Sequence, residues 1–143
     1  LHLPMEAMEL LKEIRIGEIQ GQIGREVARS HPELWRRWLS SDPDFAFPGG
    51  ETRRHLAERG VRAFRTIAEH PYRAVVVASH GAILTATFKW FMGIPSDHPP
   101  FALQNGSITT CELTRDGRFV MHDRDNVSHL SSGARSGPGD LPI

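Results

Sequence analysis

The sequence lacks the features that define several classes of protein. It has a single cysteine, so no disulfide can form within the chain and nothing indicates an oxidising compartment. Its 17 basic and 17 acidic side chains cancel, which removes the charge typical of proteins that bind nucleic acids or anionic membranes. The longest apolar run, residues 74–78, is far shorter than the roughly 20 residues of a membrane-spanning helix. We therefore expect a cytoplasmic, globular protein with no nucleic-acid or membrane partner.

Length and composition favour one folded domain followed by a short tail. A chain of 143 residues suits a single domain, which buries roughly two-thirds of the surface of its unfolded chain. Residues 131–143 include eight Gly, Pro or Ser and show no apolar periodicity, a composition typical of a flexible segment. We assign residues 1–130 to the domain and expect residues 131–143 to form a flexible tail.

Helical periodicity is clearest in the middle of the chain. Over residues 51–69, small or apolar side chains recur at spacings of three and four, which predicts an amphipathic helix. Residues 81–92 predict another helix, ended by the glycine and proline that follow. Pro32 splits the helix-forming residues 23–39, so we expect two short helices there, with Ser30 as the N-cap of the second.

Extended structure is predicted in three places. Residues 10–21 indicate a short extended segment that leads into a loop. Residues 75–78 are a continuous apolar run rich in valine, as expected of a strand covered on both faces. Asp116 and Gly117 form a strong hairpin signal between residues 107–113 and 118–122. Helices around a buried strand, followed by a hairpin, predict an α/β layered domain.

The end of the predicted buried strand is the sharpest candidate site. Ser79, His80 and Gly81 follow the strand and precede a helix, so we expect His80 at the carboxyl edge of a sheet, where α/β proteins place ligands. The free N–H groups of that helix would be available to an anion. From local context alone, a histidine with a purely structural role at a strand end is equally compatible. Ser79 as the nucleophile of a hydrolase is disfavoured, because Val77 stands where such a turn needs glycine.

Two further segments carry weaker local signals. Glu13 could be a general acid and Gly17 a position of close backbone approach, although a glutamate between Lys12 and Arg15 is more often a solvated charge. Residues 47–52 form a tight loop feeding a helix, with an acidic residue at the positive end of that helix. The eight histidines show no metal-ligand spacing, so we expect neither a metal nor another cofactor.

Taken in order, five motifs resemble the histidine phosphatase superfamily, which has the phosphoglycerate-mutase-like fold. They are Leu11-x-Glu13-x-x-x-Gly17-x-x-x-Gly21, Pro48-Gly49-Gly50-Glu51-Thr52 with Arg59 on the following helix, Val75-Val76-Val77-x-Ser79-His80-Gly81, Asn105-Gly106-Ser107-Ile108-Thr109, and Asn126-Val127-Ser128-His129-Leu130. The resemblance covers about residues 8–130 and implies a three-layer α/β/α domain.

The resemblance also implies a chemistry. In such enzymes the histidine of an Arg-His-Gly motif attacks phosphorus and becomes phosphohistidine, while a glutamate protonates the leaving oxygen and then activates water. The matching positions imply that Glu13 is the acid/base and His80 the second histidine of the pocket. Gly81 and Asn105 are implied to bind the substrate. The expected substrate is a small phosphorylated metabolite, with hydrolysis favoured over a mutase reaction.

One departure from the family pattern is clear. The chain contains no Arg-His-Gly sequence, and the nearest string, Arg54-His55-Leu56, lies inside a predicted helix. We therefore expect the chain to match the C-terminal two-thirds of such a domain, incomplete at its N-terminus, which puts the activity of this chain alone in doubt. The alternative is a non-catalytic remnant that serves as a binding or oligomerising module. Because an unpaired sheet edge recruits partners, we expect a homo-oligomer or a requirement for the missing segment.

Overall fold

The computed structural model of the chain describes residues 3–98, 101 and 103–131, so the predicted tail beyond Ser131 lies outside the described residues. Two short 3-10 helices come first, then helices of the α type, then a pair of strands. In chain order these elements are η1 (Glu9–Leu11), η2 (Gly17–Ile19), α1 (Gly24–Ser30), α2 (Pro32–Leu39), α3 (Arg53–Glu69), α4 (Gly81–Phe91), β1 (Ile108–Leu113) and β2 (Phe119–Asn126).

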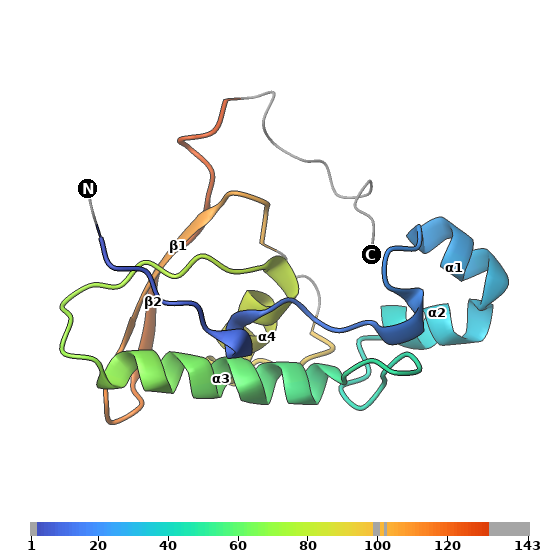
Figure 1. Ribbon diagram of the computed structural model, residues 1–143, viewed down its shortest axis with the longest axis horizontal. Coiled ribbons are helices and arrows are strands. Elements are labelled where there is room, and N and C mark those ends of the chain that lie inside the picture. Colours follow the sequence, from blue (N-terminus) through green and yellow to red (C-terminus); the bar gives the residue numbers. More distant parts are fainter. Residues whose placement is uncertain (1–2, 99–100, 102, 132–143) are drawn as a thin grey trace.

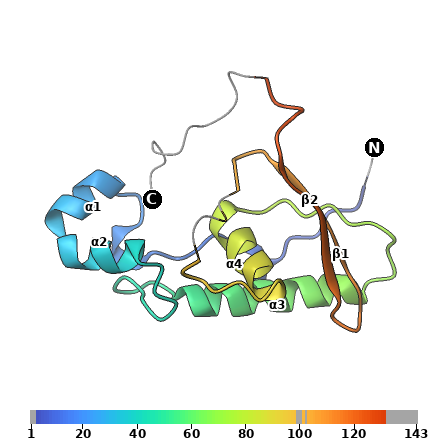
Figure 2. The same ribbon diagram turned by 180° about the vertical axis from the view of Figure 1, so that it is seen from behind.

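The long helix α3 organises the molecule. Figure 1 shows α4 beside it, the β1–β2 hairpin near its C-terminal end, and α1 and α2 beyond its N-terminal end; Figure 2 shows the same order from behind. α3 and α4 come into close contact at Gly60, where a Cβ atom would lie only 1.9 Å from Oγ1 of Thr87. Thr87 is fully buried and satisfies its hydroxyl by donating to the carbonyl of Ile83 at 2.7 Å. A glycine at this crossing therefore sets the distance between the two helices.

Two apolar clusters hold these elements together. The first joins η2 and α1 to the loop before α3, and it consists of Ile16, Ile19, Val27, Phe45 and Phe47. The second lies between α3, α4 and the hairpin, around Phe64, Phe88 and Phe101. Fully burying an apolar side chain of this size contributes about 1.5–3 kcal/mol. The first cluster thus fixes the loop after Glu13, and the second supports α4.

The hairpin forms where the sequence predicts it. β1 and β2 are antiparallel, with Leu113 opposite Phe119. The N–H of Thr114 donates to the carbonyl of Arg118 at 3.0 Å, and Gly117 takes a φ of +89° between them. A left-handed residue at the end of a three-residue loop is a common hairpin geometry, and it explains the glycine.

The helices predicted for residues 23–39, 51–69 and 81–92 are confirmed, but the cap assigned to Ser30 is wrong. Ser30 is the last residue of α1, and its hydroxyl donates to the carbonyl of Glu26 at 2.9 Å. Because Pro32 is itself the first residue of α2, the N-cap position falls on His31, which makes no side-chain capping bond.

The buried strand predicted for residues 75–78 is also wrong. Among the described residues, only β1 and β2 form a sheet, and residues 75–78 pair with neither. Val75 is 48% exposed and Val76 is 89% exposed, whereas Val77 packs against the second cluster. Such an apolar run is buried as a strand only where neighbouring strands pair with it and other layers cover its faces. The described part of the chain supplies no such neighbours.

None of the helices in the described ranges combines the length and the apolar character needed to cross a bilayer.

Candidate active site

Glu13 lies against the N-terminus of α4. One carboxylate oxygen, Oε2, accepts the backbone N–H of Ala82 at 3.1 Å, and the other, Oε1, accepts that of Ile83 at 3.2 Å. Oε1 also accepts the N–H of Ile14 at 2.8 Å. A helix begins with N–H groups that have no partner within the helix and carry a partial positive charge, so a carboxylate is well placed there. The N–H groups of Ala82 and Ile83, expected to be free for an anion, are therefore bound by a side chain of the same protein.

The other predicted residues lie around the same helix terminus. His80 is the N-cap residue of α4; its side chain is exposed and its ring makes no hydrogen bond to the described residues. Gly81 opens α4, and a Cβ atom there would lie 4.0 Å from the carbonyl oxygen of Leu103. Asn105 is exposed on a turn in which the N–H of Ser107 donates to the carbonyl of Gln104 at 3.1 Å. The structure thus brings Glu13, His80 and Gly81 together, with the turn that contains Asn105 alongside. Within the described residues, Asn105 makes no hydrogen bond to these three.

Residues 10–15, called the Glu13 segment below, are attached to α3 by Arg59. The guanidinium donates through Nη1 to the carbonyls of Leu10 and Lys12, both at 2.7 Å, and through Nη2 to that of Glu13 at 3.0 Å. The carbonyl of Leu11 between them accepts the hydroxyl of Ser79 at 2.7 Å. Two side chains from distant positions in the sequence therefore bind four consecutive carbonyls of the Glu13 segment.

Glu51, two residues before the start of α3, completes this network. Its carboxylate pairs with Arg59 through two hydrogen bonds, from Nε at 3.0 Å and Nη2 at 2.7 Å, and the side chains of both residues are largely buried. It also accepts the N–H of Arg15 at 2.9 Å, while the N–H of Glu51 donates to the carbonyl of Arg15 at 2.8 Å. Burial opposes ionisation of Glu51, but the bonds from Arg59 and Arg15 outweigh it, and the pKa of Glu51 lies below its ordinary value.

Glycine 17 lets the loop after Glu13 dock on the loop before α3. Gly17 has a φ of +62°, and a Cβ atom there would lie 2.0 Å from the carbonyl oxygen of Pro48. The next residue, Glu18, donates its N–H to that same carbonyl at 3.0 Å. The motif around Glu13 and the motif around Glu51 are therefore in direct contact, and glycine is required at the point of approach.

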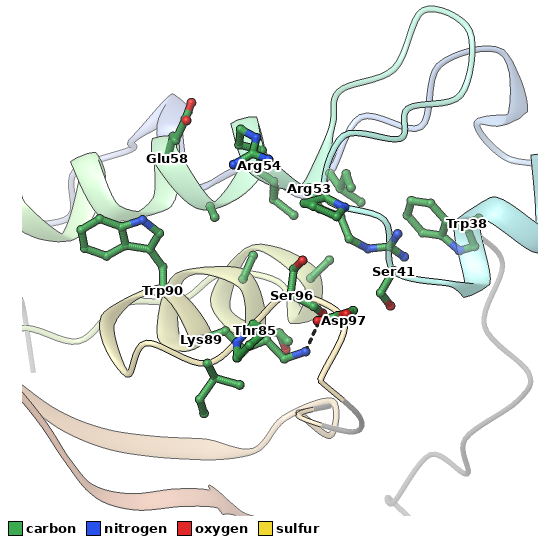
Figure 3. Close-up of a pocket in the computed structure, with 18 residues that line it drawn as sticks. Trp38, Ser41, Arg53, Arg54, Glu58, Thr85, Lys89, Trp90, Ser96 and Asp97 are labelled. Carbon is green, nitrogen blue, oxygen red and sulfur yellow. Dashed lines mark hydrogen bonds between the residues drawn. The ribbon is translucent and has the colours of Figure 1, made fainter.

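A pocket of about 570 Å³ opens beside the Glu13 segment, between α3, α4 and the turn after α4. Ile14 and Ala82, the chain neighbours of Glu13 and Gly81, line it. Figure 3 shows Arg53 and Trp38 together at one end, where the guanidinium carbon lies 4.0 Å from the indole centroid. Lys89 donates to the carbonyls of Ser96 and His98, and burial, together with the nearby charge of Arg53, lowers its pKa. The pocket wall thus combines aromatic surface with three cationic side chains, those of Arg53, Arg54 and Lys89.

Across residues 3–98, 101 and 103–131, no three His, Cys, Asp or Glu side chains gather in a way that could hold a metal ion. The only cysteine, Cys111, is half-buried on β1, and burial raises its pKa.

An α/β frame with a carboxylate and a histidine at one helix N-terminus is an arrangement suited to phosphoryl chemistry. The model of the histidine phosphatase superfamily (branch 1) matches residues 1–126, so the chain belongs to this family. The family predicted from the five motifs is therefore confirmed.

Curated relatives agree with this assignment. The chain is 35% identical over 124 residues to the metal-independent phosphoserine phosphatase of Arabidopsis thaliana, covering 85% of this chain and 50% of that protein. It is 32% identical over 131 residues to phosphoserine phosphatase 1 of Hydrogenobacter thermophilus, covering 86% and 61%. The chain thus spans about half to three-fifths of the length of these relatives.

Solved structures show the same fold. YhfR of Bacillus stearothermophilus superposes with a TM-score of 0.79 at 25% identity, covering 87% of this chain and 62% of that one. A mycobacterial glucosyl-3-phosphoglycerate phosphatase in complex with VO3 gives a TM-score of 0.73 at 22% identity, covering 87% and 64%. The predicted α/β fold class, of the phosphoglycerate-mutase-like type, is confirmed.

Sequence reasoning left two contributors to the site without a role. Ser79 was weighed only as a nucleophile, whereas its hydroxyl binds the carbonyl of Leu11. From the sequence, Arg59 was assigned no role beyond its place in a motif, although its spacing on α3 indicated that its side chain needs buried partners. It lies three residues after Leu56 and four before Ala63, which are both buried, so it shares the buried face of α3. An arginine on such a face requires partners, and the carbonyls of the Glu13 segment supply them.

Proposed function

We propose that this chain carries the acid/base part of a phosphomonoesterase that acts on a small phosphorylated metabolite through a phosphohistidine. The observation that carries this proposal is the position of the Glu13 carboxylate at the N-terminus of α4, next to His80. In its protonated form Glu13 donates a proton to the leaving oxygen, and the carboxylate that results then takes a proton from the attacking water. His80 and the backbone at Gly81 contact the phosphoryl group, and Asn105 contributes to substrate binding.

The nucleophile, in this proposal, is a histidine of an Arg-His-Gly segment that this chain does not contain. The support is twofold: the chain has no such tripeptide, and it spans only 50–61% of its phosphoserine phosphatase relatives. Attack by that histidine forms a nitrogen–phosphorus bond as the ester oxygen leaves with the proton from Glu13. Water then breaks the nitrogen–phosphorus bond and releases inorganic phosphate. No step requires a metal ion.

Hydrolysis rather than a mutase reaction is the preferred outcome. Two of the curated relatives are named phosphoserine phosphatases, and the motif that ends in Asn126-Val127-Ser128-His129-Leu130 resembles the phosphatase side of the family. Phosphoserine is therefore the first substrate to test.

The test compares the complete protein encoded by the reading frame that contains this chain with the chain alone. We expect phosphate release from phosphoserine, and an acid-labile phosphohistidine trapped by rapid quenching, from the complete protein only. A complete protein that binds phosphoserine but forms neither product nor phosphoenzyme would contradict the proposal.

A non-catalytic role is the second candidate, and one observation favours it. Residues 75–78 have no ladder partner among the described residues, and Val76 is 89% exposed. An unpaired apolar segment of this kind is a site for association, and a second copy of the chain is the partner we would expect. Sedimentation equilibrium decides: this role predicts a dimer or larger species, and a 16.0 kDa monomer that melts cooperatively would exclude it.

A further inference from the structure

The carbonyl groups of the Glu13 segment identify the residues that determine where Glu13 lies. Beyond the short turn of η1, this segment belongs to neither a helix nor a sheet, so its backbone groups need other partners. The carbonyls of Leu10, Lys12 and Glu13 all find the same partner, the guanidinium of Arg59. One side chain therefore supplies hydrogen-bond donors to these carbonyls, as the N–H groups of a neighbouring strand do in a sheet.

The hydrogen-bonding capacity of Arg59 is used completely. An arginine side chain has five N–H donors in one plane. Here the Nε atom and the two Nη atoms make five hydrogen bonds, two to Glu51 and three to carbonyls of the Glu13 segment. A lysine has three donors on a flexible stem and cannot reproduce this planar pattern.

Glu51 orients that guanidinium and also binds the far end of the segment. Its two-point pair with Arg59 fixes the plane of the five donors. Through its own N–H and its carboxylate, Glu51 makes two hydrogen bonds to the backbone of Arg15. The backbone is thus bound on both sides of Glu13, by Arg59 of α3 and by Glu51 just before α3, while the Glu13 carboxylate reaches the N-terminus of α4.

Ser79, the residue before His80, is hydrogen-bonded to the same segment. Its hydroxyl donates to the carbonyl of Leu11 at 2.7 Å, so the chain that presents His80 and the chain that presents Glu13 share a direct bond. The relative position of the two site residues is therefore set by Ser79 on one side and by the contact of Glu13 with Ala82 and Ile83 on the other.

We infer that Arg59, oriented by Glu51, and Ser79 are positioning residues that place the Glu13 carboxylate at the N-terminus of α4. The inference rests on the proposed acid/base role of Glu13 for its catalytic consequence, and on the hydrogen bonds alone for its structural one. None of the three residues contacts the reacting atoms in this scheme; each acts through the backbone of the Glu13 segment.

The structural arm of the test uses the chain itself. In a two-dimensional NMR spectrum, Glu13→Gln identifies how the amide signals of Ala82 and Ile83 depend on the Glu13 carboxylate. We expect Arg59→Lys to move these two signals toward their Glu13→Gln positions, while most amides of α3 and the hairpin stay in place. The matched control is Arg62→Lys, an exposed arginine of the same helix with no side-chain hydrogen bond to the described residues; it should leave both signals unmoved.

The kinetic arm uses the complete protein with two substrates. Phosphoserine has an alkoxide leaving group that needs a proton, whereas p-nitrophenyl phosphate has one that hardly does. A displacement of about 1 Å can cost about 100-fold in rate, so we expect Arg59→Lys to lower kcat for phosphoserine by about that factor and for p-nitrophenyl phosphate far less. A general loss of folding or of phosphate binding would affect both substrates alike.

Ser79 supplies the second variant, which keeps the test decisive if Arg59→Lys does not fold. Ser79→Ala should move the Ala82 and Ile83 signals in the same direction by a smaller amount, and Ser79→Thr, which keeps the hydroxyl, should restore them. Unmoved signals in every folded variant would overturn the inference, as would equal losses on both substrates. If the complete protein has no phosphatase activity, the proposed function fails while the NMR arm still decides the positioning role.

Discussion

The two segments that lead into the candidate site are held in opposite ways. The Glu13 segment has four consecutive carbonyls bound by side chains of Arg59 and Ser79. Residues 75–78, which lead to His80, make no backbone hydrogen bond to the described residues, and Val76 is 89% exposed. The position of Glu13 is thus determined within this chain, whereas the segment before His80 has the composition of a buried strand without the neighbours that bury one.

The largest expected effect on stability comes from removing Arg59. Arg59→Leu leaves Glu51 as a buried, unpaired carboxylate and releases three carbonyls of the Glu13 segment. Breaking a buried ion pair from one side costs about 3–5 kcal/mol, a large part of the roughly 5–15 kcal/mol that stabilises a domain. Urea unfolding measures the loss, and Arg62→Leu is the control on the same helix. A loss below about 1 kcal/mol would mean that the pair contributes no more than an exposed one.

A pH experiment tests Glu51 separately. Its pKa lies below the ordinary value of 4.5, so its ionised form stabilises the fold at pH values above 4.5, and this contribution is lost as the pH falls through the lowered pKa. Glu51→Gln should therefore destabilise the chain at neutral pH and reduce the dependence of stability on pH in the acid range. Melting curves between pH 7 and the acid transition measure both effects. If the stability of the two proteins depended on pH in the same way, the assignment of a stabilising, ionised carboxylate to Glu51 would be contradicted.

The smallest expected effect on stability is in residues 75–78, the segment that leads to His80. In the chain alone, Val76→Thr should change the free energy of unfolding by less than about 0.5 kcal/mol, because the side chain is exposed. In the complete protein we expect a greater loss, since a paired and covered strand would bury the new hydroxyl. Equal effects in both proteins would show that residues 75–78 stay uncovered even there.

The sequence predicted the local elements better than the contacts between them. Helices around Leu56 and Ile83 and the turn at Gly117 follow from periodicity and turn chemistry, which are local properties. The exposure of Val76 depends on which strands lie beside it, and no local pattern reports that. The same holds for Arg59, whose partners are carbonyl groups more than forty residues earlier in the chain.

The candidate site shows the same division. The resemblance to the histidine phosphatase superfamily implied that Glu13 and His80 share one site, and the structure brings them to one helix terminus. The sequence could not show that the Glu13 carboxylate accepts hydrogen bonds from the N–H groups of Ala82 and Ile83, because side-chain direction in an irregular segment is set by its distant partners. Ser79 illustrates the point, since its role is a hydrogen bond to Leu11, 68 positions away.

The central claim, that Glu13 is the proton donor of the site, is tested most directly by Glu13→Gln in the complete protein. Removing a general acid should lower kcat for phosphoserine by about two to four powers of ten, and far less for p-nitrophenyl phosphate, whose phenolate leaves readily without a proton. Equal losses on the two substrates would contradict the claim and would leave Glu13 as a structural cap of α4.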